Sequence, residues 1–192
     1  MFYCVLTTIQ RPTDCVRRLA AQLSSSGGRL VVIGDSKGPD QFPLNDVDGF
    51  SADQLTFLSL ENQLQSGSEL SRMLPTKHYS RKNLGYLHAL RSGATCVYET
   101  DDDNGPLDSW KLRSEHVMNV RAVRSAKDVA PAWVNVYREF TDQNIWPRGL
   151  PLDRIHGANQ TDPSAGTNPV WAPIQQGLAD GSPDVDAIWR LV

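Results

Sequence analysis

The sequence has little of several features that mark particular classes of protein. Its three cysteines form no CxxC pair, so neither a disulfide framework nor a cysteine-based zinc site is expected. The formal net charge is −3, which argues against a protein that holds nucleic acid through a basic surface. No apolar run approaches the roughly 20 residues that span a bilayer, and no signal peptide is recognisable. Together these absences favour a cytoplasmic protein with no membrane span and no nucleic-acid partner.

Markers of two common kinds of catalytic site are also missing. The chain has no GxSxG nucleophile motif, and its four histidines do not have the spacing of metal ligands. Its 192 residues are enough for one domain with a buried core and are not comfortably enough for two. We therefore expect a single domain over residues 1–192, without a histidine metal site.

What the sequence does contain is an alternation of strands and helices. Residues 2–9 are rich in β-branched and aromatic side chains and predict a strand. Thr13 or Asp14 can cap a helix over residues 15–24. The uninterrupted apolar run over residues 30–33 is typical of a parallel strand that is buried on both faces. This order predicts parallel strands that are joined by a right-handed crossover.

The alternation continues further along the chain. The pattern predicts a strand over residues 55–60, a helix over residues 79–91 and a strand over residues 95–98. One stripe of that helix is expected to face the core, and its members are Tyr79, Asn83, Leu87, Leu90 and Ala94. Residues 116–123 and 133–140 predict two more strands. The whole order indicates an open α/β sheet, which binds ligands at the carboxyl ends of its strands.

Three adjacent aspartates, Asp101, Asp102 and Asp103, follow the strand that is predicted over residues 95–98. Adjacent carboxylates repel one another and persist where a cation or several donors neutralise them. Such oxygen ligands suit Mg²⁺ or Mn²⁺, which typically bridge one or two carboxylates to substrate phosphates. In an extended segment Asp101 and Asp103 would point to the same side, so this pair is the predicted metal site. The alternative is an acidic surface turn that ends at residues 104–106.

Other polar residues occur where strands end or a helix begins. Thr8 ends the first predicted strand and Asp35 ends the second, where a carboxylate could accept from a base or a ribose hydroxyl. Arg81, Lys82 and Asn83 open a helix and could face a diphosphate. Each also has an ordinary structural explanation: a strand residue for Thr8, a local turn for Asp35 and a solvated helix start for the others.

In their order, several segments resemble one family, the STELLO-type glycosyltransferases. More distantly, the chain is similar to the reversibly glycosylated polypeptides, which are UDP-arabinopyranose mutases. The resemblance spans nearly the whole chain. Its specific blocks are Arg-Lys-Asn with Gly-Tyr-Leu at 81–87, Glu-Thr-Asp-Asp-Asp-Asn at 99–104, and Trp-Pro-Arg-Gly with Pro-Leu at 146–152. The blocks at residues 7–9 and 31–35 are not specific, and further matching blocks lie at residues 176–181 and 183–191.

The resemblance implies a GT-A type fold, which is a Rossmann-like sheet with flanking helices that binds a nucleotide sugar. It implies a metal-dependent glycosyltransferase that uses a nucleoside diphosphate sugar, expected to be a UDP-sugar, with Mn²⁺ or Mg²⁺ as cofactor. Asp101 and Asp103 would be the metal ligands of a DxD motif, and Asp101 and Asp102 would also lie against the nucleotide. Asp103 and Arg148 are the expected catalytic residues, with Arg148 as a contact of the sugar or the diphosphate.

By the same resemblance, Thr8 and Asp35 would line the base and ribose pocket, with Arg81 and Asn83 beside it. Relatives continue past the position of Val192 into a segment that looks like the acceptor-side catalytic base. We therefore expect the fold to be truncated at the C-terminus. Two alternatives stay open, a sugar-nucleotide mutase and a catalytically silent nucleotide-sugar-binding or scaffold domain. The sequence does not identify the acceptor, which could be a glycan, a lipid or a protein.

Overall fold

The chain divides into two compact units, Met1–Ser114 and Glu115–Val192. The structure is a computed structural model, and it describes residues 1–121, 133–143, 145–151, 153 and 166–179. The single domain expected over residues 1–192 stays a prediction. Among the helices within these described ranges, none is long and apolar enough to cross a membrane.

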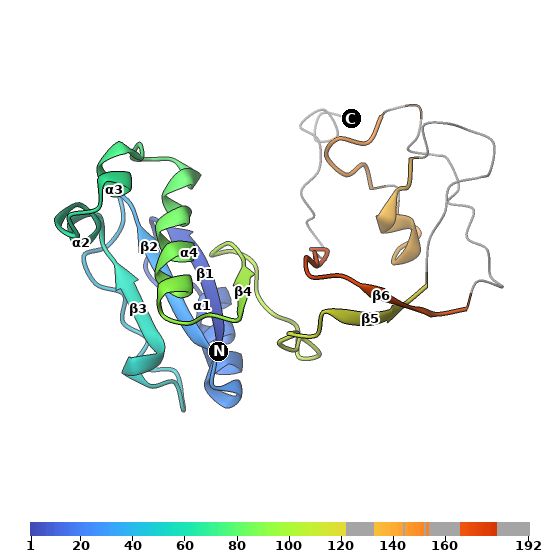
Figure 1. Cartoon of the computed structure of the whole chain (residues 1–192), viewed down its shortest axis with the longest axis horizontal. Coiled ribbons are helices and arrows are strands. Elements are labelled where there is room, and N and C mark those ends of the chain that lie inside the picture. The colour runs from blue at the N-terminus through green and yellow to red at the C-terminus, as the bar shows by residue number, and fades with distance from the viewer. Residues whose placement is uncertain (122–132, 144, 152, 154–165, 180–192) are drawn as a thin grey trace. The chain divides into compact units, whose positions relative to one another are not determined.

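The first unit is built on a parallel sheet of four strands in the order β3-β2-β1-β4 (Figure 1). Its strands are β1 (Phe2–Thr8), β2 (Arg29–Gly34), β3 (Leu55–Leu58) and β4 (Cys96–Glu99). The two central strands, β1 and β2, pair from Tyr3 opposite Arg29 to Thr8 opposite Gly34. The predicted Rossmann-like α/β sheet with flanking helices is therefore confirmed.

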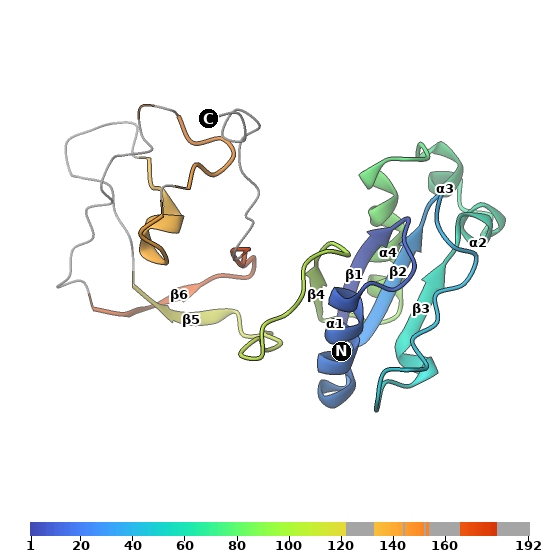
Figure 2. The same ribbon diagram turned by 180° about the vertical axis from the view of Figure 1, so that it is seen from behind.

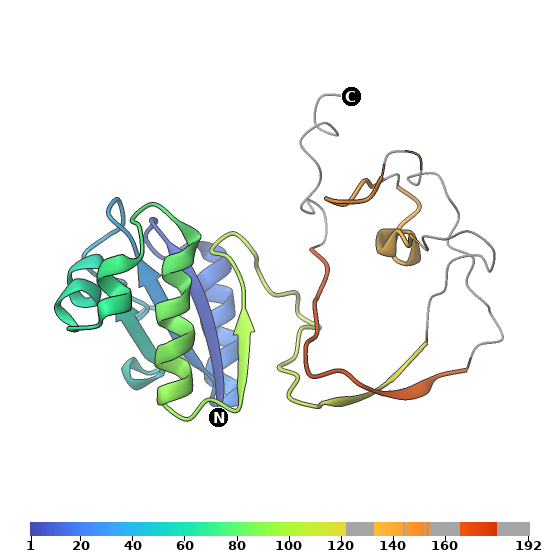
Figure 3. The same cartoon turned by 45° about the horizontal axis from the view of Figure 1, so that its top comes forward.

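Helices α1 (Asp14–Ser26) and α4 (Lys82–Arg91) lie on opposite faces of this sheet (Figure 3). Figure 1 shows the α4 side and Figure 2, from behind, the α1 side. Helix α1 begins where predicted, because the Thr13 side chain accepts a hydrogen bond from the Val16 backbone N–H. It ends at Gly27, whose φ of 67° is the left-handed conformation that glycine adopts without strain.

Side chains along β1 and β2 alternate between two core clusters. One cluster packs under α1 and contains Cys4, Leu6, Val16, Leu19, Ala20, Leu23, Leu30, Val32, Phe42, Leu44 and Phe50. The other packs under α4 and contains Tyr3, Val5, Val31, Ile33 and Ala89. This period of two explains the uninterrupted apolar runs in the sequence, since both faces of each central strand are covered.

Helix α4 does not bury the predicted stripe. A short 3₁₀ turn, η2 (Tyr79–Arg81), precedes α4, whose buried residues are Lys82, Gly85 and Ala89. A Cβ atom added at Gly85 would lie 2.5 Å from Val5 Cγ1 and 3.1 Å from Ile33 Cγ1. The stripe prediction was wrong because α4 approaches the sheet through small residues, which leaves Tyr79 and Leu90 exposed.

The segment between β2 and β4 carries the remaining small elements of the first unit. These are η1 (Ala52–Gln54), α2 (Leu60–Gln65) and α3 (Glu69–Met73). Gln63 of α2 is buried, and its amide donates to Gly34 O at 2.8 Å and to Leu58 O at 2.7 Å. Gln63 therefore joins the ends of β2 and β3 to the helices that follow.

The second unit contains an antiparallel ribbon of β5 (Val117–Val120) and β6 (Asn168–Trp171). The strand predicted over residues 133–140 is wrong, because this segment forms the 3₁₀ turn η3 (Val136–Glu139). Asn135 caps that turn by accepting a hydrogen bond from the Tyr137 backbone N–H at 3.2 Å. Residues 122–123 of the other predicted strand, the block at 183–191 and the expected truncation after it lie outside the described residues.

Candidate functional site

The carboxyl ends of β1, β2 and β4 lie along one edge of the sheet and carry most of the predicted site residues. Thr8 ends β1, Asp35 follows β2, and the aspartates follow β4. Parallel pairing of β1 with both neighbours is what gathers these three segments, which are far apart in the sequence. The sheet therefore brings Thr8, Asp35 and the acidic segment together, as the sequence predicted.

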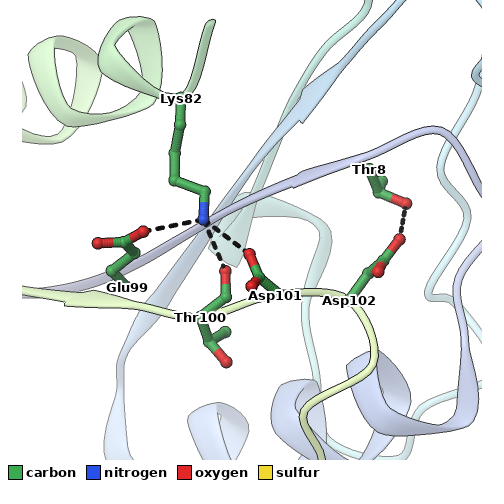
Figure 4. Close-up of polar contacts among 6 residues, drawn as sticks. All are labelled: Thr8, Lys82, Glu99, Thr100, Asp101 and Asp102. Carbon is green, nitrogen blue, oxygen red and sulfur yellow. Dashed lines mark hydrogen bonds and ion pairs between the residues drawn. The ribbon is translucent and has the colours of Figure 1, made fainter. Parts of the chain in front are cut away.

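The acidic segment consists of Asp101, Asp102 and Asp103 and is called the acidic turn below. It turns at Asp102 and Asp103, whereas the metal prediction assumed an extended chain. The backbone N–H of Asn104 donates to Asp101 O at 3.4 Å across this turn. The Asp102 carboxylate accepts a hydrogen bond from the Thr8 hydroxyl (Figure 4). Asp103 is exposed, and its carbonyl accepts from Cys15 Sγ at 3.2 Å. The alternation that would align Asp101 with Asp103 therefore does not apply here.

Lys82 contacts the other carboxylate of this segment. Its Nζ lies 2.9 Å from Asp101 Oδ1, 3.0 Å from Glu99 Oε1 and 3.2 Å from Thr100 O (Figure 4). Burial lowers the pKa of Lys82, but hydrogen bonds and charges of Asp101 and Glu99 outweigh that effect, and the pKa is raised overall. The Lys82 ammonium is therefore a fixed positive charge at the edge of the acidic turn.

Lys82 is the main residue that the sequence prediction missed. The sequence suggested it only as one of three polar residues at a helix start, where it would be solvated or face a phosphate. The available signal is the helical spacing of Lys82, Gly85 and Ala89, which places the lysine on the same side as two small residues. A small-residue face allows close packing on the sheet, and such packing buries a lysine at the end of that face.

Asp35 holds the loop that precedes η2. Its Oδ1 accepts from the Ser36 backbone N–H at 2.6 Å. Its Oδ2 accepts from the backbone N–H groups of Lys77 at 2.6 Å and His78 at 3.3 Å. Lys77 has a φ of 56°, which is uncommon for a residue with a side chain. The Asp35 carboxylate therefore fixes a turn that lies beside the end of β2.

Arg81 lies inside the first unit, with 1% of its surface exposed. Its guanidinium donates to Gln63 Oε1 at 2.8 Å and to Leu74 O at 2.8 Å. Burial lowers the pKa of Arg81, and the charge of Asp35 opposes that shift. The predicted diphosphate contact of Arg81 stays a prediction, and the structure shows a guanidinium that ties α4 to α2 and α3.

The remaining predicted residues occupy different places. Asn83 is exposed at the start of α4, and its Nδ2 donates to Ser80 O at 2.9 Å. Arg148 is exposed in the second unit, in a turn where Gly149 has a φ of 87°. Asn83 thus lies in the same unit as the acidic turn, whereas Arg148 belongs to the other compact unit.

Two cavities open at this edge of the first unit. One, of about 360 Å³, is lined by Thr7, Thr8, Ile9, Gln10, Ile33, Gly34, Asp35, Lys37, Lys77, His78, Tyr79, Arg81 and Asp102. The other, of about 370 Å³, is lined by His78, Tyr79, Ser80, Lys82, Asn83, Tyr86, Glu99 and Asp101. His78 and Tyr79 line both cavities, and consecutive aspartates line one each. The acidic turn therefore borders two neighbouring spaces.

The chemistry of the carboxylates fits a divalent cation that shares its ligands with a phosphate. In the part of the chain that the structure describes, no group of three or more His, Cys, Asp or Glu side chains is placed to hold a metal ion by itself. Mg²⁺ and Mn²⁺ commonly take only one or two carboxylates and complete their shell with phosphate oxygens and water. The metal site at Asp101 and Asp103 stays a prediction, with hard oxygen donors present for it.

Fold and site define an α/β protein whose cavities lie at the carboxyl ends of a parallel sheet, the usual ligand position in this class. No model of a known protein family matches the chain. "Probable glycosyltransferase STELLO1" of Arabidopsis thaliana is 27% identical over 197 residues, which cover 96% of this chain and 24% of the relative. "Probable glycosyltransferase STELLO2" of the same plant is 26% identical with the same coverage.

These comparisons confirm the resemblance to the STELLO-type family that the sequence blocks indicated. The chain spans 24% of the length of the curated relatives that it matches. The aligned part covers 96% of this chain, so it includes the acidic turn near the middle of the sequence.

Proposed function

We propose that the first unit binds a nucleoside diphosphate sugar, with UDP as the expected nucleotide, as part of a metal-dependent glycosyltransferase. The observation that carries this proposal is the pair of cavities that border the acidic turn, one lined by Asp102 and the other by Asp101. A nucleotide sugar consists of two bulky parts that are joined by a diphosphate. Each part would have a cavity, and the diphosphate would lie beside the aspartates. The names of the two relatives, both probable glycosyltransferases, support the reaction class.

The base and ribose would lie in the cavity that is lined by Thr8, Gly34 and Asp35. Hydrogen bonds from the backbone of Lys77 and His78 fix the orientation of the Asp35 carboxylate. A carboxylate has about four lone-pair positions, so Asp35 can still accept from a ribose hydroxyl or a base N–H. An oriented acceptor of this kind recognises a ligand without first losing side-chain freedom.

The sugar would lie in the cavity that is lined by Tyr79, Asn83 and Tyr86. A sugar ring presents hydroxyl groups around an apolar face. The exposed Tyr79 ring offers apolar surface, and the Asn83 amide offers both donors and an acceptor. Glu99 and Asp101 line the same space and add carboxylate acceptors for hydroxyl groups.

Asp101 and Asp103 would hold Mn²⁺ or Mg²⁺ together with the diphosphate oxygens. The cation would supply positive charge where the leaving diphosphate develops negative charge. Asp103 is exposed, so a metal can approach it. Arg148 stays a candidate contact of the sugar or the diphosphate, as the family resemblance implies. Arg81 lines the nucleotide cavity, but its guanidinium already donates to Gln63 and Leu74, so it would support the site through its positive charge.

Calorimetric titration of UDP into the purified chain, with and without Mn²⁺, tests this proposal. We expect saturable binding that depends on Mn²⁺. The double variant Asp101→Asn/Asp103→Asn should bind at least about tenfold more weakly, because it removes both anionic ligands while it keeps the side-chain shapes. Equal UDP affinity in the wild type and the double variant would refute the proposed site.

Asp108→Asn is the matched control for that titration. Its carboxylate is exposed and lies 3.8 Å from Arg18 Nη2, outside the acidic turn. This variant should bind UDP as the wild type does. Product analysis then separates the reaction classes: a ring-size change in a UDP-sugar alone would indicate a mutase. Binding without turnover, even with added acceptors, would indicate a silent nucleotide-sugar-binding domain.

A further inference from the structure

All three protons of the Lys82 ammonium have a protein acceptor within reach. Glu99, Thr100 and Asp101 each place one oxygen at 2.9–3.2 Å from Nζ. An ammonium has three donors, so Lys82 cannot donate to a phosphate without giving up one of these contacts. Its place in the candidate site is therefore that of a counter-ion to the carboxylates.

The lysine and its two carboxylate partners differ in how deeply they are buried. The Lys82 side chain is 6% exposed, whereas those of Glu99 and Asp101 are 59% and 47% exposed. The Lys82 side chain is thus more deeply buried than the two carboxylates, and all three residues line the same cavity. A divalent cation that approaches Asp101 from the cavity would meet a carboxylate whose charge is already offset from behind.

The surrounding structure holds the ammonium in this position. Lys82 begins α4, one helical turn before Gly85, where the helix lies close to Val5 and Ile33. The Tyr79 ring has its centroid 5.9 Å from Lys82 Nζ, within the range of a cation–π contact. Because the stem is buried and the helix is close to the sheet, Lys82 has little freedom to withdraw.

We propose that Lys82 is a positioning residue that keeps the free chain from binding a divalent cation at Asp101, so that metal entry depends on a nucleoside diphosphate. The metal and the ammonium repel each other across the shared carboxylate. A diphosphate adds negative charge and oxygen ligands, which offset that repulsion. Binding of the metal and of the nucleotide is therefore coupled, and each raises the affinity for the other. The idea rests on the proposed function for the identity of the nucleotide.

The test measures Mn²⁺ binding in the absence of any nucleotide, by electron paramagnetic resonance of free Mn²⁺ with the whole chain. We expect weak binding by the wild type and binding at least about tenfold tighter by Lys82→Met, which keeps the buried stem without the charge. Lys82→Arg keeps a positive charge and should bind Mn²⁺ as weakly as the wild type. Adding Asp101→Asn to Lys82→Met should remove the gain.

Lys111→Met is the matched control, since Lys111 is an exposed lysine of the same unit, and it should leave Mn²⁺ binding unchanged. Equal Mn²⁺ affinity in the wild type and in folded Lys82→Met would overturn the inference, as would wild-type binding of Mn²⁺ alone that is as tight as binding with UDP present. Lys82→Gln provides the same comparison where the methionine variant does not fold. Absence of UDP binding in all variants would instead overturn the proposed function, because the measurement with Mn²⁺ alone involves no nucleotide.

Discussion

The two faces of the parallel sheet bury different kinds of side chain. On the α1 face, apolar residues of the helix and both central strands form a continuous cluster, which Phe42, Leu44 and Phe50 extend. On the α4 face the apolar cluster is small, and the buried residues of the helix are Lys82, Gly85 and Ala89. Arg81 is buried just before them. The α1 face therefore buries mainly apolar side chains, whereas the α4 face also buries two cations at the end of the sheet where the site lies.

This difference has an energetic meaning. Full burial of a leucine or valine side chain contributes roughly 1.5–3 kcal/mol to the free energy of unfolding. A buried ammonium or guanidinium lowers that free energy unless its donors all find acceptors. The α1 face thus supplies most of the stability of the first unit, whereas the α4 face carries the charges that a ligand site needs. Mutations on the two faces should separate stability from binding.

The largest effect on stability is expected for Leu19→Ala on the α1 face. Leu19 is 2% exposed within the α1 cluster, and its removal leaves a cavity that the packed strands cannot close. The free energy of unfolding should fall by about 2–5 kcal/mol, as measured by urea denaturation. The folded fraction should bind UDP with unchanged affinity, because Leu19 lines neither cavity.

Leu64→Ala serves as the control, since Leu64 is 45% exposed on α2 and should cost much less. Equal destabilisation by the two substitutions would show that the α1 cluster does not dominate stability. Loss of UDP affinity in folded Leu19→Ala would show that the two faces are not separate in function.

A smaller loss of stability is expected for Gly85→Ala, which tests the close approach on the α4 face. The added Cβ would overlap Val5 Cγ1 and crowd Ile33, and both are buried. Crowding of this kind costs about 1–3 kcal/mol, while alanine regains about 1 kcal/mol of helix propensity. Thermal unfolding should therefore occur at a lower temperature, with a net loss of up to about 2 kcal/mol in the free energy of unfolding.

Gly177→Ala is the matched substitution, because no described atom lies within 4 Å of a Cβ added there. It should leave the unfolding temperature nearly unchanged. An unchanged unfolding temperature in Gly85→Ala would mean that α4 can move away from the sheet at no cost.

The two faces also differ in how far the sequence predicts them. The apolar runs of β1 and β2 and the capping position of Thr13 are local signals, so these strands and α1 occur where they were expected. The core side of α4 depends instead on a contact with strands that are distant in the sequence. A hydrophobic stripe cannot reveal a helix that packs through Gly85 and Ala89, so the predicted stripe was wrong.

The candidate site, too, was predicted in some features and missed in others. The parallel order predicted that Thr8, Asp35 and the aspartates would meet at one edge, and they do. The side-chain directions of the aspartates were not predictable from a period of two, because the chain turns at Asp102. Lys82 was missed for a related reason. Its charge suggested an exposed position, whereas its three acceptors lie at the end of β4 and just after it, 17–19 residues further along the chain.

The smallest effect is expected for His88, whose protonation on the α4 face makes the free energy of unfolding depend on pH. Burial lowers the pKa of His88 on α4 below its ordinary value of 6.5, so the folded state favours the neutral ring. Well above pH 6.5 the ring is neutral in both states and its titration does not affect stability. As the pH falls below 6.5, the unfolded chain binds the proton first, and stability decreases until the pH passes the folded pKa.

His88→Gln removes this titration. The unfolding free energy measured by urea denaturation should therefore fall less steeply as the pH drops below 6.5. His116→Gln, at an exposed position of the second unit, should leave the fall as it is in the wild type. Only the slopes of the unfolding free energy against pH are compared. A change in stability that the glutamine also causes at pH 8 therefore does not affect the conclusion. An identical slope in the wild type and His88→Gln would mean that the α4 face does not disfavour a charged imidazole at this position. The chemistry of that face would then be confined to the buried cations at the start of the helix.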